Sequence, residues 1–184
     1  MIRDYVGHDI DLSNTGFGLP IWYNESLSSV TVLQDQDITG VYRDILCLAC
    51  TNVTYDNLTL VNTSITISDG VDVTLDELNI AHDQHFGVFL YESIRTSILD
   101  SDFNITSDEQ ALLEYFNTKN TLVNDSRFVA SGSGATIIAV QGISGAFISI
   151  IPSLQLMMAC SSTMMLIIRH LSTTLLLLAV CLWK

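Results

Sequence analysis

Short apolar segments that recur at intervals of about 20 to 24 residues constrain the fold of this chain more than any other feature. The last apolar residue of each of five similar segments can be taken as a reference position. The numbers of successive reference positions differ by 23, 20, 24 and 24: Val32, Tyr55, Leu75, Leu99 and Val123. Self-similarity with a period of roughly 20 to 50 residues is the signature of an array in which each repeat packs on the next.

Two further patterns accompany the reference positions. Residues 18–27 (GLPIWYNESL) resemble residues 87–94 (GVFLYESI), which lie upstream in their own unit. Downstream, another short apolar segment recurs at four positions whose numbers differ by 20, 25 and 25: Leu58, Leu78, Phe103 and Phe128. Each unit therefore holds about three short β-type segments separated by Asn, Asp, Ser and Gly turns.

Strands this short cannot bury their apolar side chains alone, whereas stacking of successive units buries them. Each strand then pairs in parallel with its equivalent one coil away, at about 4.8 Å. The sequence predicts an all-β fold, a right-handed parallel β-helix of about five or six coils over residues 18–150. A β-sandwich is the alternative because its strands are also short, but it predicts no self-similarity at this period.

Charge and hydrophobicity divide the chain into two parts that meet near residues 131–134. The 20 Asp and Glu residues all lie between Asp4 and Asp125, and only Arg169 and Lys184 are charged beyond position 134. The acidic balance excludes nucleic acid as a partner, because phosphate binding needs clustered Lys and Arg. We expect residues 1–17 to be a lead-in or the remnant of a longer chain, and residues 151–184 to be an apolar tail.

The tail contains 22 uncharged residues at positions 147–168, enough to span a bilayer. We expect it to be helical or membrane-spanning, with Arg169 on the cytoplasmic side. A lipid-anchor signal is a second interpretation, with small residues at 161–163 and a hydrophobic end at 171–183. An apolar cap on the β-helix and a shifted reading frame are the remaining alternatives.

Six Asn-x-Ser/Thr sequons occur where about two are expected by chance. They favour an extracellular location, although Asn and Thr are also common in the turns and strands of such a fold. No apolar secretory signal is visible at the N-terminus. The sequons predict glycosylation at six residues: Asn24, Asn52, Asn57, Asn62, Asn104 and Asn124.

Two segments resemble a known group of proteins. Residues 87–100 (GVFLYESIRTSILD) and 52–60 (NVTYDNLTL) are similar to repeats of the pectate-lyase-like β-helix superfamily, within it most of all to those of NosD-like and carbohydrate-binding cell-surface proteins. The resemblance covers residues 18–150 and implies an extracellular or periplasmic scaffold. Some relatives cleave or bind polysaccharides, and NosD proteins assist copper-site assembly. The fold alone does not choose among these functions.

Aspartates follow the reference positions in three successive coils, at Asp56, Asp76 and Asp100, and Asn124 follows in the next. Stacked carboxylates about 5 Å apart repel each other. Bound Ca²⁺ would relieve this repulsion, because it accepts oxygen ligands in loose geometry. The alternative is a solvated ladder in which Asx side chains hold the turns. Apart from this Ca²⁺, the sequence predicts no cofactor.

Asp102 and Arg127 each precede the phenylalanine of their coil, so stacking would place them side by side as an ion pair. With Asp100, they are the residues we would assign to catalysis if the chain were a polysaccharide lyase or hydrolase. No catalytic motif of a known family supports that assignment.

Two further clusters invite a metal interpretation. His82, Asp83 and His85 could hold copper or zinc, but the sequence favours the alternative, in which they form a surface turn between coils. Cys47 and Cys50 could share a metal or be redox-active. Residues three apart in a strand point to opposite faces, so we expect Cys50 inside, Cys47 outside and no shared metal.

The sequence favours a cell-surface or exported, non-catalytic scaffold or adhesin-like module. Trp22 and Tyr91 are the residues we expect to be exposed and to stack on sugars. The expected partners are a polysaccharide or cell-surface protein, the membrane through the tail, and further copies through end-to-end association of exposed sheet edges. A polysaccharide-cleaving enzyme and periplasmic copper handling are the alternatives.

Overall fold

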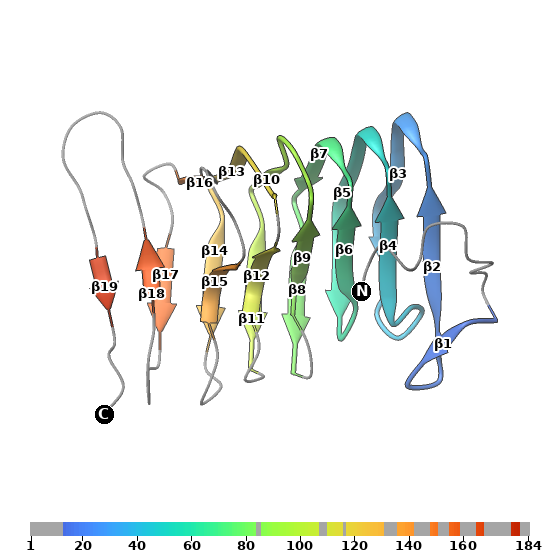
Figure 1. Cartoon of the computed structure of the whole chain (residues 1–184). Helices are drawn as coiled ribbons and strands as arrows, with labels where there is room; N and C mark the ends of the chain where they lie inside the picture. The colour runs from blue at the N-terminus through green and yellow to red at the C-terminus, as the bar shows by residue number, and fades with distance from the viewer. Residues whose placement is uncertain are drawn as a thin grey trace.

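A computed structural model shows a parallel β-solenoid in which flat coils stack along one axis (Figure 1). The structure describes residues 13–83, 86–106, 110–115, 117–130, 136–141, 148–150, 155–158, 165–167 and 178–180. Every regular element in these ranges is a strand. Four successive turns, beginning at residues 19, 44, 64 and 88, have side chains described almost throughout, and the same ladder continues beyond them. The predicted all-β parallel β-helix is confirmed.

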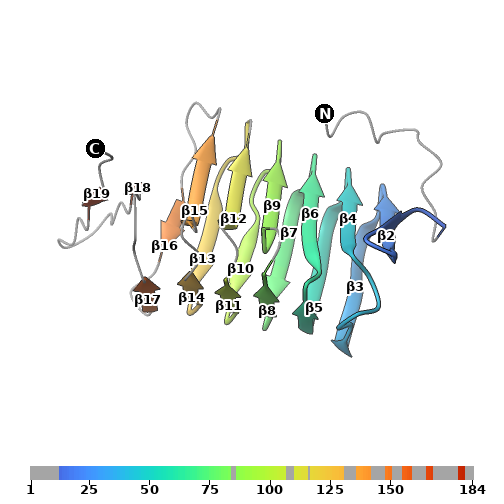
Figure 2. The same cartoon turned by 90° about the horizontal axis from the view of Figure 1, so that it is seen from below.

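Three parallel arrays of strands form the faces of the solenoid, and the strands of each array follow one another along the axis in Figure 2. The first face consists of β2 (Leu19–Glu25), β4 (Asp44–Leu48), β6 (Ser64–Ser68), β9 (Val88–Tyr91), β12 (Gln110–Tyr115) and β15 (Thr136–Gln141). The second consists of β3 (Ser28–Asp37), β5 (Thr51–Val61), β7 (Val71–Asp76), β10 (Ser97–Leu99), β13 (Thr121–Asn124) and β16 (Ile148–Ile150).

The ends of the long strands β3 and β5 bend into the third face and pair there. This face continues through β8 (Asn79–His82), β11 (Asp102–Ile105), β14 (Arg127–Ala130) and β17 (Gln155–Met158). Two antiparallel pairings lie outside the three arrays: β1 (Thr15–Gly16) pairs with β2, and β18 (Met165–Ile167) pairs with β19 (Leu178–Val180).

Equivalent apolar residues of successive coils stack in the interior, as a solenoid requires. In the second face the stacked residues are Leu33, Tyr55, Leu75, Ile98 and Val123, all buried. In the third face Phe103 lies on Phe128, with ring centroids 4.4 Å apart and planes inclined by 7°.

The strand register differs by one residue from the predicted reference positions in two coils. Leu33 rather than Val32 aligns with Tyr55, because the pairing of β3 with β5 shifts between Thr31 and Leu33. Ile98 rather than Leu99 aligns with Leu75. Such one-residue errors move a side chain to the opposite face of a strand, and they decide where the predicted Asp100 lies.

Three corners of each coil contain one residue in the left-handed backbone region, and these residues fall at equivalent positions in successive coils. Asn and Asp tolerate positive φ better than other non-glycine residues, which explains the recurring Asn and Asp of the sequence. The rows are Ser26, Ala49, Asp69 and Glu92; Ser29, Asn52, Asp72, Arg95 and Asn120; and Asp35, Asn57, Glu77, Asp100 and Asp125.

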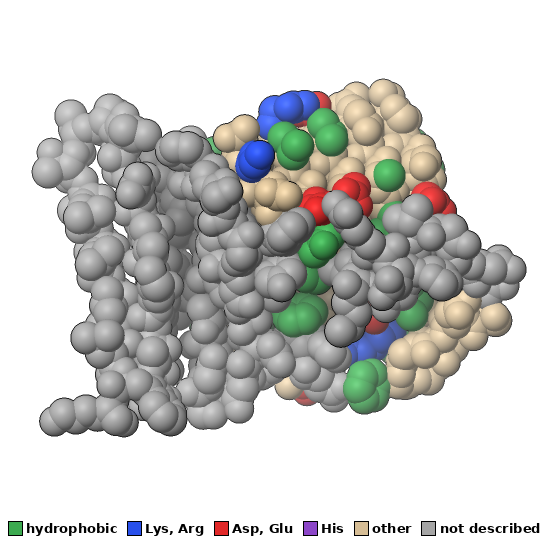
Figure 3. Space-filling view, viewed as in Figure 1, with side chains coloured by type: hydrophobic (Ala, Val, Ile, Leu, Met, Phe, Trp, Pro, Cys, Tyr) green, Lys and Arg blue, Asp and Glu red, His purple; other side chains and the backbone are tan. Residues whose placement is uncertain are grey.

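Polar contacts join neighbouring coils along these rows. Asn57 Nδ2 donates to Asp35 Oδ1 at 2.7 Å, and Arg95 donates through Nε and Nη2 to the carboxylate of Asp72 at 2.6 and 2.7 Å. The described acidic side chains are mostly at such corners and outward positions. On the face shown in Figure 3, acidic side chains lie beside hydrophobic ones in the described part.

The predicted tail, residues 151–184, is described only in part. Its described residues lie in β17, which pairs with β14, and in the β18–β19 pair. No helix in the described ranges is long and apolar enough to cross a membrane. Most of the predicted span at 147–168 lies outside the described residues, so membrane anchoring stays a prediction.

Candidate functional site

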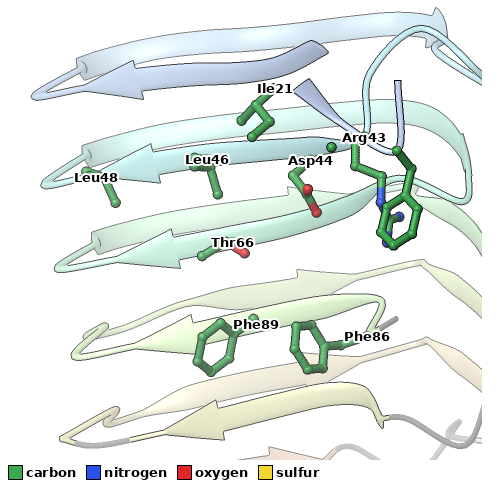
Figure 4. A pocket seen from close by; sticks show the side chains of 10 residues that line it. Ile21, Arg43, Asp44, Leu46, Leu48, Thr66, Phe86 and Phe89 are labelled. Atoms are coloured by element: carbon green, nitrogen blue, oxygen red, sulfur yellow. The ribbon is translucent and has the colours of Figure 1, made fainter. Parts of the chain in front are cut away.

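A groove of about 260 Å³ lies on the outer side of the first face, near its N-terminal coils (Figure 4). We call it the first-face groove. Its walls come from the β1 hairpin, from the start and outer face of β4, and from β6 and β9. The lining residues are Gly16, Phe17, Ile21, Arg43, Asp44, Leu46, Leu48, Thr66, Phe86 and Phe89.

Parallel pairing brings these side chains together from distant parts of the sequence. Leu46 aligns with Thr66, and Thr66 aligns with Phe89. Each of these three residues directly follows an inward-facing residue of its strand, so its own side chain points outward. Leu46 and Leu48 are only 8% and 1% exposed although neither belongs to the interior cluster. These two leucines therefore give the groove an apolar, buried floor.

Two aromatic rings form one wall of the groove. The centroids of Phe86 and Phe89 are 5.4 Å apart and their planes are inclined by 36°, a spacing within the favourable range for aromatic pairs. Figure 4 shows both rings opposite Leu46 and Asp44. The wall offers aromatic surface on which a flat or ring-shaped apolar group could pack.

Arg43 is a buried cation at one end of the groove, only 3% exposed. Its Nη1 donates to the carbonyl oxygen of Asn62 at 3.0 Å and lies 3.2 Å from Nε2 of His82. The ring of Phe17 lies over the guanidinium, with 4.9 Å from Cζ to the ring centroid. Its Nη2 is buried and has no hydrogen-bond partner among the residues that the structure describes.

Gly16 makes room for this arginine. A Cβ atom at position 16 would lie 2.9 Å from Cγ of Arg43, closer than side-chain atoms tolerate. Any larger residue at position 16 would push Cγ of Arg43 aside, and the guanidinium would move with it. The β1 hairpin thus positions both Gly16 and Phe17 against the arginine.

His82 supports Arg43 from the interior side. Because Nη1 of Arg43 is a donor, Nε2 of His82 must accept, and the ring is neutral with its proton on Nδ1. Burial, aided by the positive charge of Arg43, lowers the pKa of His82 to about 4, and Asp83 opposes the shift. Ser64 completes the contact: its Oγ lies 3.3 Å from Nε2 and donates to the carbonyl oxygen of Phe86 at 2.8 Å.

Asp44 follows Arg43 directly and lies half-buried in the groove. Burial raises the pKa of its carboxyl group, and the charge of Arg43 partly opposes this rise. Among the described residues no ion pair joins the two side chains. The groove thus combines a cation, a desolvated carboxyl group and aromatic rings.

The predicted aspartate ladder is only partly correct. Asp56 and Asp76 do align in β5 and β7, but Leu99 aligns with Asp76 where Asp100 was expected. Asp100 lies one residue further on, at a corner with φ of 46°. Burial raises the pKa of Asp76, and the charges of Asp56 and Asp100 raise it further, so the three carboxylates are still close enough to interact.

No group of three or more His, Cys, Asp or Glu side chains in the described ranges is placed to hold a metal. The Ca²⁺ interpretation of Asp56, Asp76 and Asp100 therefore has no further support. His82 and Asp83 are described and His85 lies outside the described residues. A buried His82 beside the Arg43 cation is also a poor copper or zinc ligand, because positive charge next to the ring disfavours a second cation.

The predicted pair of Asp102 and Arg127 is present. The two residues align in β11 and β14, and Nη1 of Arg127 lies 2.8 Å from Oδ2 of Asp102, with both side chains nearly half exposed. Asp100 and Asp102 line one open cleft of about 520 Å³ together with Glu77 and Asn79. The structure thus brings the proposed carboxylates to one cleft, but Asp102 already pairs with Arg127.

This ion pair should contribute little to stability because solvent screens it. A double-mutant cycle with Asp102→Asn and Arg127→Gln is expected to give a coupling free energy of about 0.2–1 kcal/mol. Urea unfolding of the two single variants and the double variant measures it. A coupling above about 2 kcal/mol would contradict the view that this is an ordinary surface pair.

The two predicted sugar-stacking residues lie in different surroundings. Trp22 is partly buried: it packs against the interior cluster, and its ring centroid lies 4.8 Å from that of Tyr42 in an edge-on contact. It covers the N-terminal end of the core because it aligns with the inward-facing Ile45. Tyr91 is half-buried and aligns with Ser68 on the outer side of the first face.

Cys47 and Cys50 form a disulfide and are both fully buried. The expectation that Cys47 points outward is wrong. β4 ends at Leu48, and the left-handed Ala49 (φ 51°) turns the chain so that both cysteines face the interior. The alternation rule holds only within a strand.

Most of the sequons fall at accessible positions. Asn52, Asn57 and Asn104 are exposed, and Asn62 and Asn124 are partly exposed. Asn24 differs from the others, because its Nδ2 atom, to which a glycan would be attached, is buried in the folded chain. Glycosylation at all six sites stays a prediction.

Sequence reasoning missed the residues of the first-face groove. Arg43 and Asp44 carry no recognisable motif, and Phe86 and Phe89 look like ordinary strand residues. One signal was available: few basic residues occur in the acidic part of the chain, and Arg43 stands at the start of an apolar strand.

No protein-family model matches the chain, and a search of curated proteins finds no match. The structure supports a parallel β-solenoid of the β-helix type without support for pectate-lyase-like or NosD-like proteins in particular.

Proposed function

We propose that this chain is an exported, non-catalytic β-solenoid module that binds glycans in the first-face groove. One observation carries the proposal: the aromatic pair of Phe86 and Phe89 lies in a concave site that also holds Arg43, Asp44 and Thr66. The C–H faces of sugar rings pack on aromatic rings, while their hydroxyl groups need nearby donors and acceptors. The groove offers both kinds of contact.

Two features support export. A fully buried disulfide between Cys47 and Cys50 is typical of proteins that fold in an oxidising compartment. Several sequons are exposed on the outside of the solenoid. In this proposal the apolar tail holds the module at a membrane, and its partner is a polysaccharide or cell-surface protein. In the described ranges β3 pairs in parallel only with β5, which leaves an edge for end-to-end association.

Glycan binding is tested by removing one aromatic ring. Phe89→Ala is expected to weaken binding of a recognised oligosaccharide at least about tenfold, because the ring's packing surface is worth more than about 1.4 kcal/mol. Titration calorimetry against a panel of neutral and charged oligosaccharides measures this. Val61→Ala, at an exposed position on the third face, is the control. Unchanged affinity in Phe89→Ala would remove the groove from the proposal.

An enzyme that cleaves polysaccharides is the second candidate, because Asp100 and Asp102 line the same open cleft. Incubation with the same panel, with and without Ca²⁺, tests it. Product release by the parent protein that disappears in a folded Asp100→Ala variant would favour the enzyme. Absence of products from every polysaccharide would exclude it.

A further inference from the structure

The guanidinium of Arg43 has no anionic partner in the described part of the chain. Its neighbours through Nη1 are the neutral carbonyl group of Asn62 and the neutral ring of His82. Buried charges are normally paired, because an uncompensated one is costly to desolvate. The free Nη2 donor at the groove therefore suits an anion from outside the chain, and carboxylates fit the guanidinium fork well.

One described aromatic side chain lies over the guanidinium that carries this donor. Phe17 covers the guanidinium, yet it is itself 80% exposed. A ligand that reaches Nη2 would have to move this ring aside. Its charge-assisted hydrogen bond would offset the aromatic contact that the guanidinium loses.

Asp44 presents the opposite charge in the same groove. Its carboxyl group accepts no hydrogen bond from the described residues and forms no ion pair with Arg43. Figure 4 shows Asp44 and Arg43 toward the same end of the groove, with Phe86 facing them. A cation-bearing ligand would compensate the desolvated carboxylate, just as an anion would compensate the arginine.

We propose that the first-face groove selects a sugar residue that carries both a carboxylate and an amine. The carboxylate binds Nη2 of Arg43, the ammonium group binds the carboxylate of Asp44, and the ring packs on Phe86 and Phe89. This inference rests on the proposed glycan-binding function of the groove and adds the chemical class of its ligand. A sugar with only a carboxylate would be repelled by the charge of Asp44, and a sugar with only an amine would be repelled by the charge of Arg43.

The size of the groove sets the extent of the ligand. Its volume of about 260 Å³ is slightly below the range of roughly 300–1,000 Å³ that drug-sized ligands occupy. It therefore accommodates one charged sugar residue, while the rest of a longer glycan lies outside it.

Four sugars with the same ring separate the two charges. They are the methyl glycosides of glucose, glucosamine, glucuronic acid and 2-amino-2-deoxyglucuronic acid, titrated into the intact protein by calorimetry or protein-observed NMR. The last, with both charges, is expected to bind at least about tenfold more tightly than any of the others. Equal affinity for glucuronic acid, or for glucosamine, would overturn the inference.

Two variants assign the charges to residues. Asp44→Asn is expected to abolish the higher affinity for the doubly charged sugar relative to glucuronic acid. Arg43→Gln is expected to abolish its higher affinity relative to glucosamine. Asp72→Asn and Arg95→Gln, which disrupt an exposed ion pair elsewhere, are the matched controls. Because Arg43→Gln could unfold the protein, the comparison of the four sugars on the parent chain stands by itself.

The outcomes distinguish this inference from the proposed function. If glycans bind and Phe89→Ala weakens their binding, but the four sugars bind with equal affinity, then the groove binds glycans and the proposed ligand class is wrong. If neither the four sugars nor the oligosaccharide panel binds, both proposals fail.

Discussion

Phe103→Ala is expected to lower the free energy of unfolding by about 3–5 kcal/mol. The ring is fully buried in the third face and stacks on Phe128 at 4.4 Å. Its removal leaves a cavity between two coils, and the stacked contact, worth about 0.5–1.5 kcal/mol beyond burial, is lost as well. Solenoid coils touch only their neighbours, so the loss cannot be repaired from elsewhere.

Urea unfolding followed by circular dichroism measures the effect. Phe17→Ala removes the same atoms from a ring that is 80% exposed, so it is the matched control and should change stability by less than about 1 kcal/mol. A similar small loss in Phe103→Ala would show that the third-face stack is not formed as described.

Acidification between about pH 6.5 and 4 is expected to destabilise the protein through His82. In the native state burial holds the pKa of His82 at about 4, against 6.5 for a free histidine. As the pH falls through this window, the unfolded chain binds a proton that the native ring does not accept. The resulting loss of stability is about 2–3 kcal/mol at most.

His82→Gln isolates this effect, because glutamine can still accept from Arg43 but does not titrate. The difference in unfolding free energy between parent and variant should shrink toward pH 4. Asp44 and Asp76, whose pKa values are raised by burial, act with the opposite sign, since their native forms bind protons more readily. They are present in both proteins and cancel in the comparison. A difference that does not change with pH would contradict a buried neutral His82.

The corners of the coils were predicted from the sequence only in part. The sequence predicts turns of Asn, Asp, Ser and Gly between the β-type segments, but it does not predict the left-handed conformation that Asn52, Asp72 and Asn120 share with Ser29 and Arg95. The row is defined by strand register, and a serine or arginine adopts that conformation only because coils above and below hold it. Local sequence alone gives no sign of it.

The strand register also determined which of the predicted sites are correct. The placement of Asp102 beside Arg127 was correct because both positions were aligned through phenylalanines that stack. The alignment of Asp100 with Asp76 failed, since the corner preceding the third face falls one residue earlier than the apolar pattern suggests. Cys47 failed for a related reason, because a corner at Ala49 interrupts the strand alternation.

Periodicity and composition were enough to define the repeat, the parallel β-solenoid and the acidic character of its body. The first-face groove, by contrast, exists only in the folded chain. Arg43, Thr66 and Phe89 come from separate coils, distant in the sequence, and become neighbours only when those coils stack. Whether a charge is paired depends on which side chains stacking brings within reach, and no local pattern of residues contains that information.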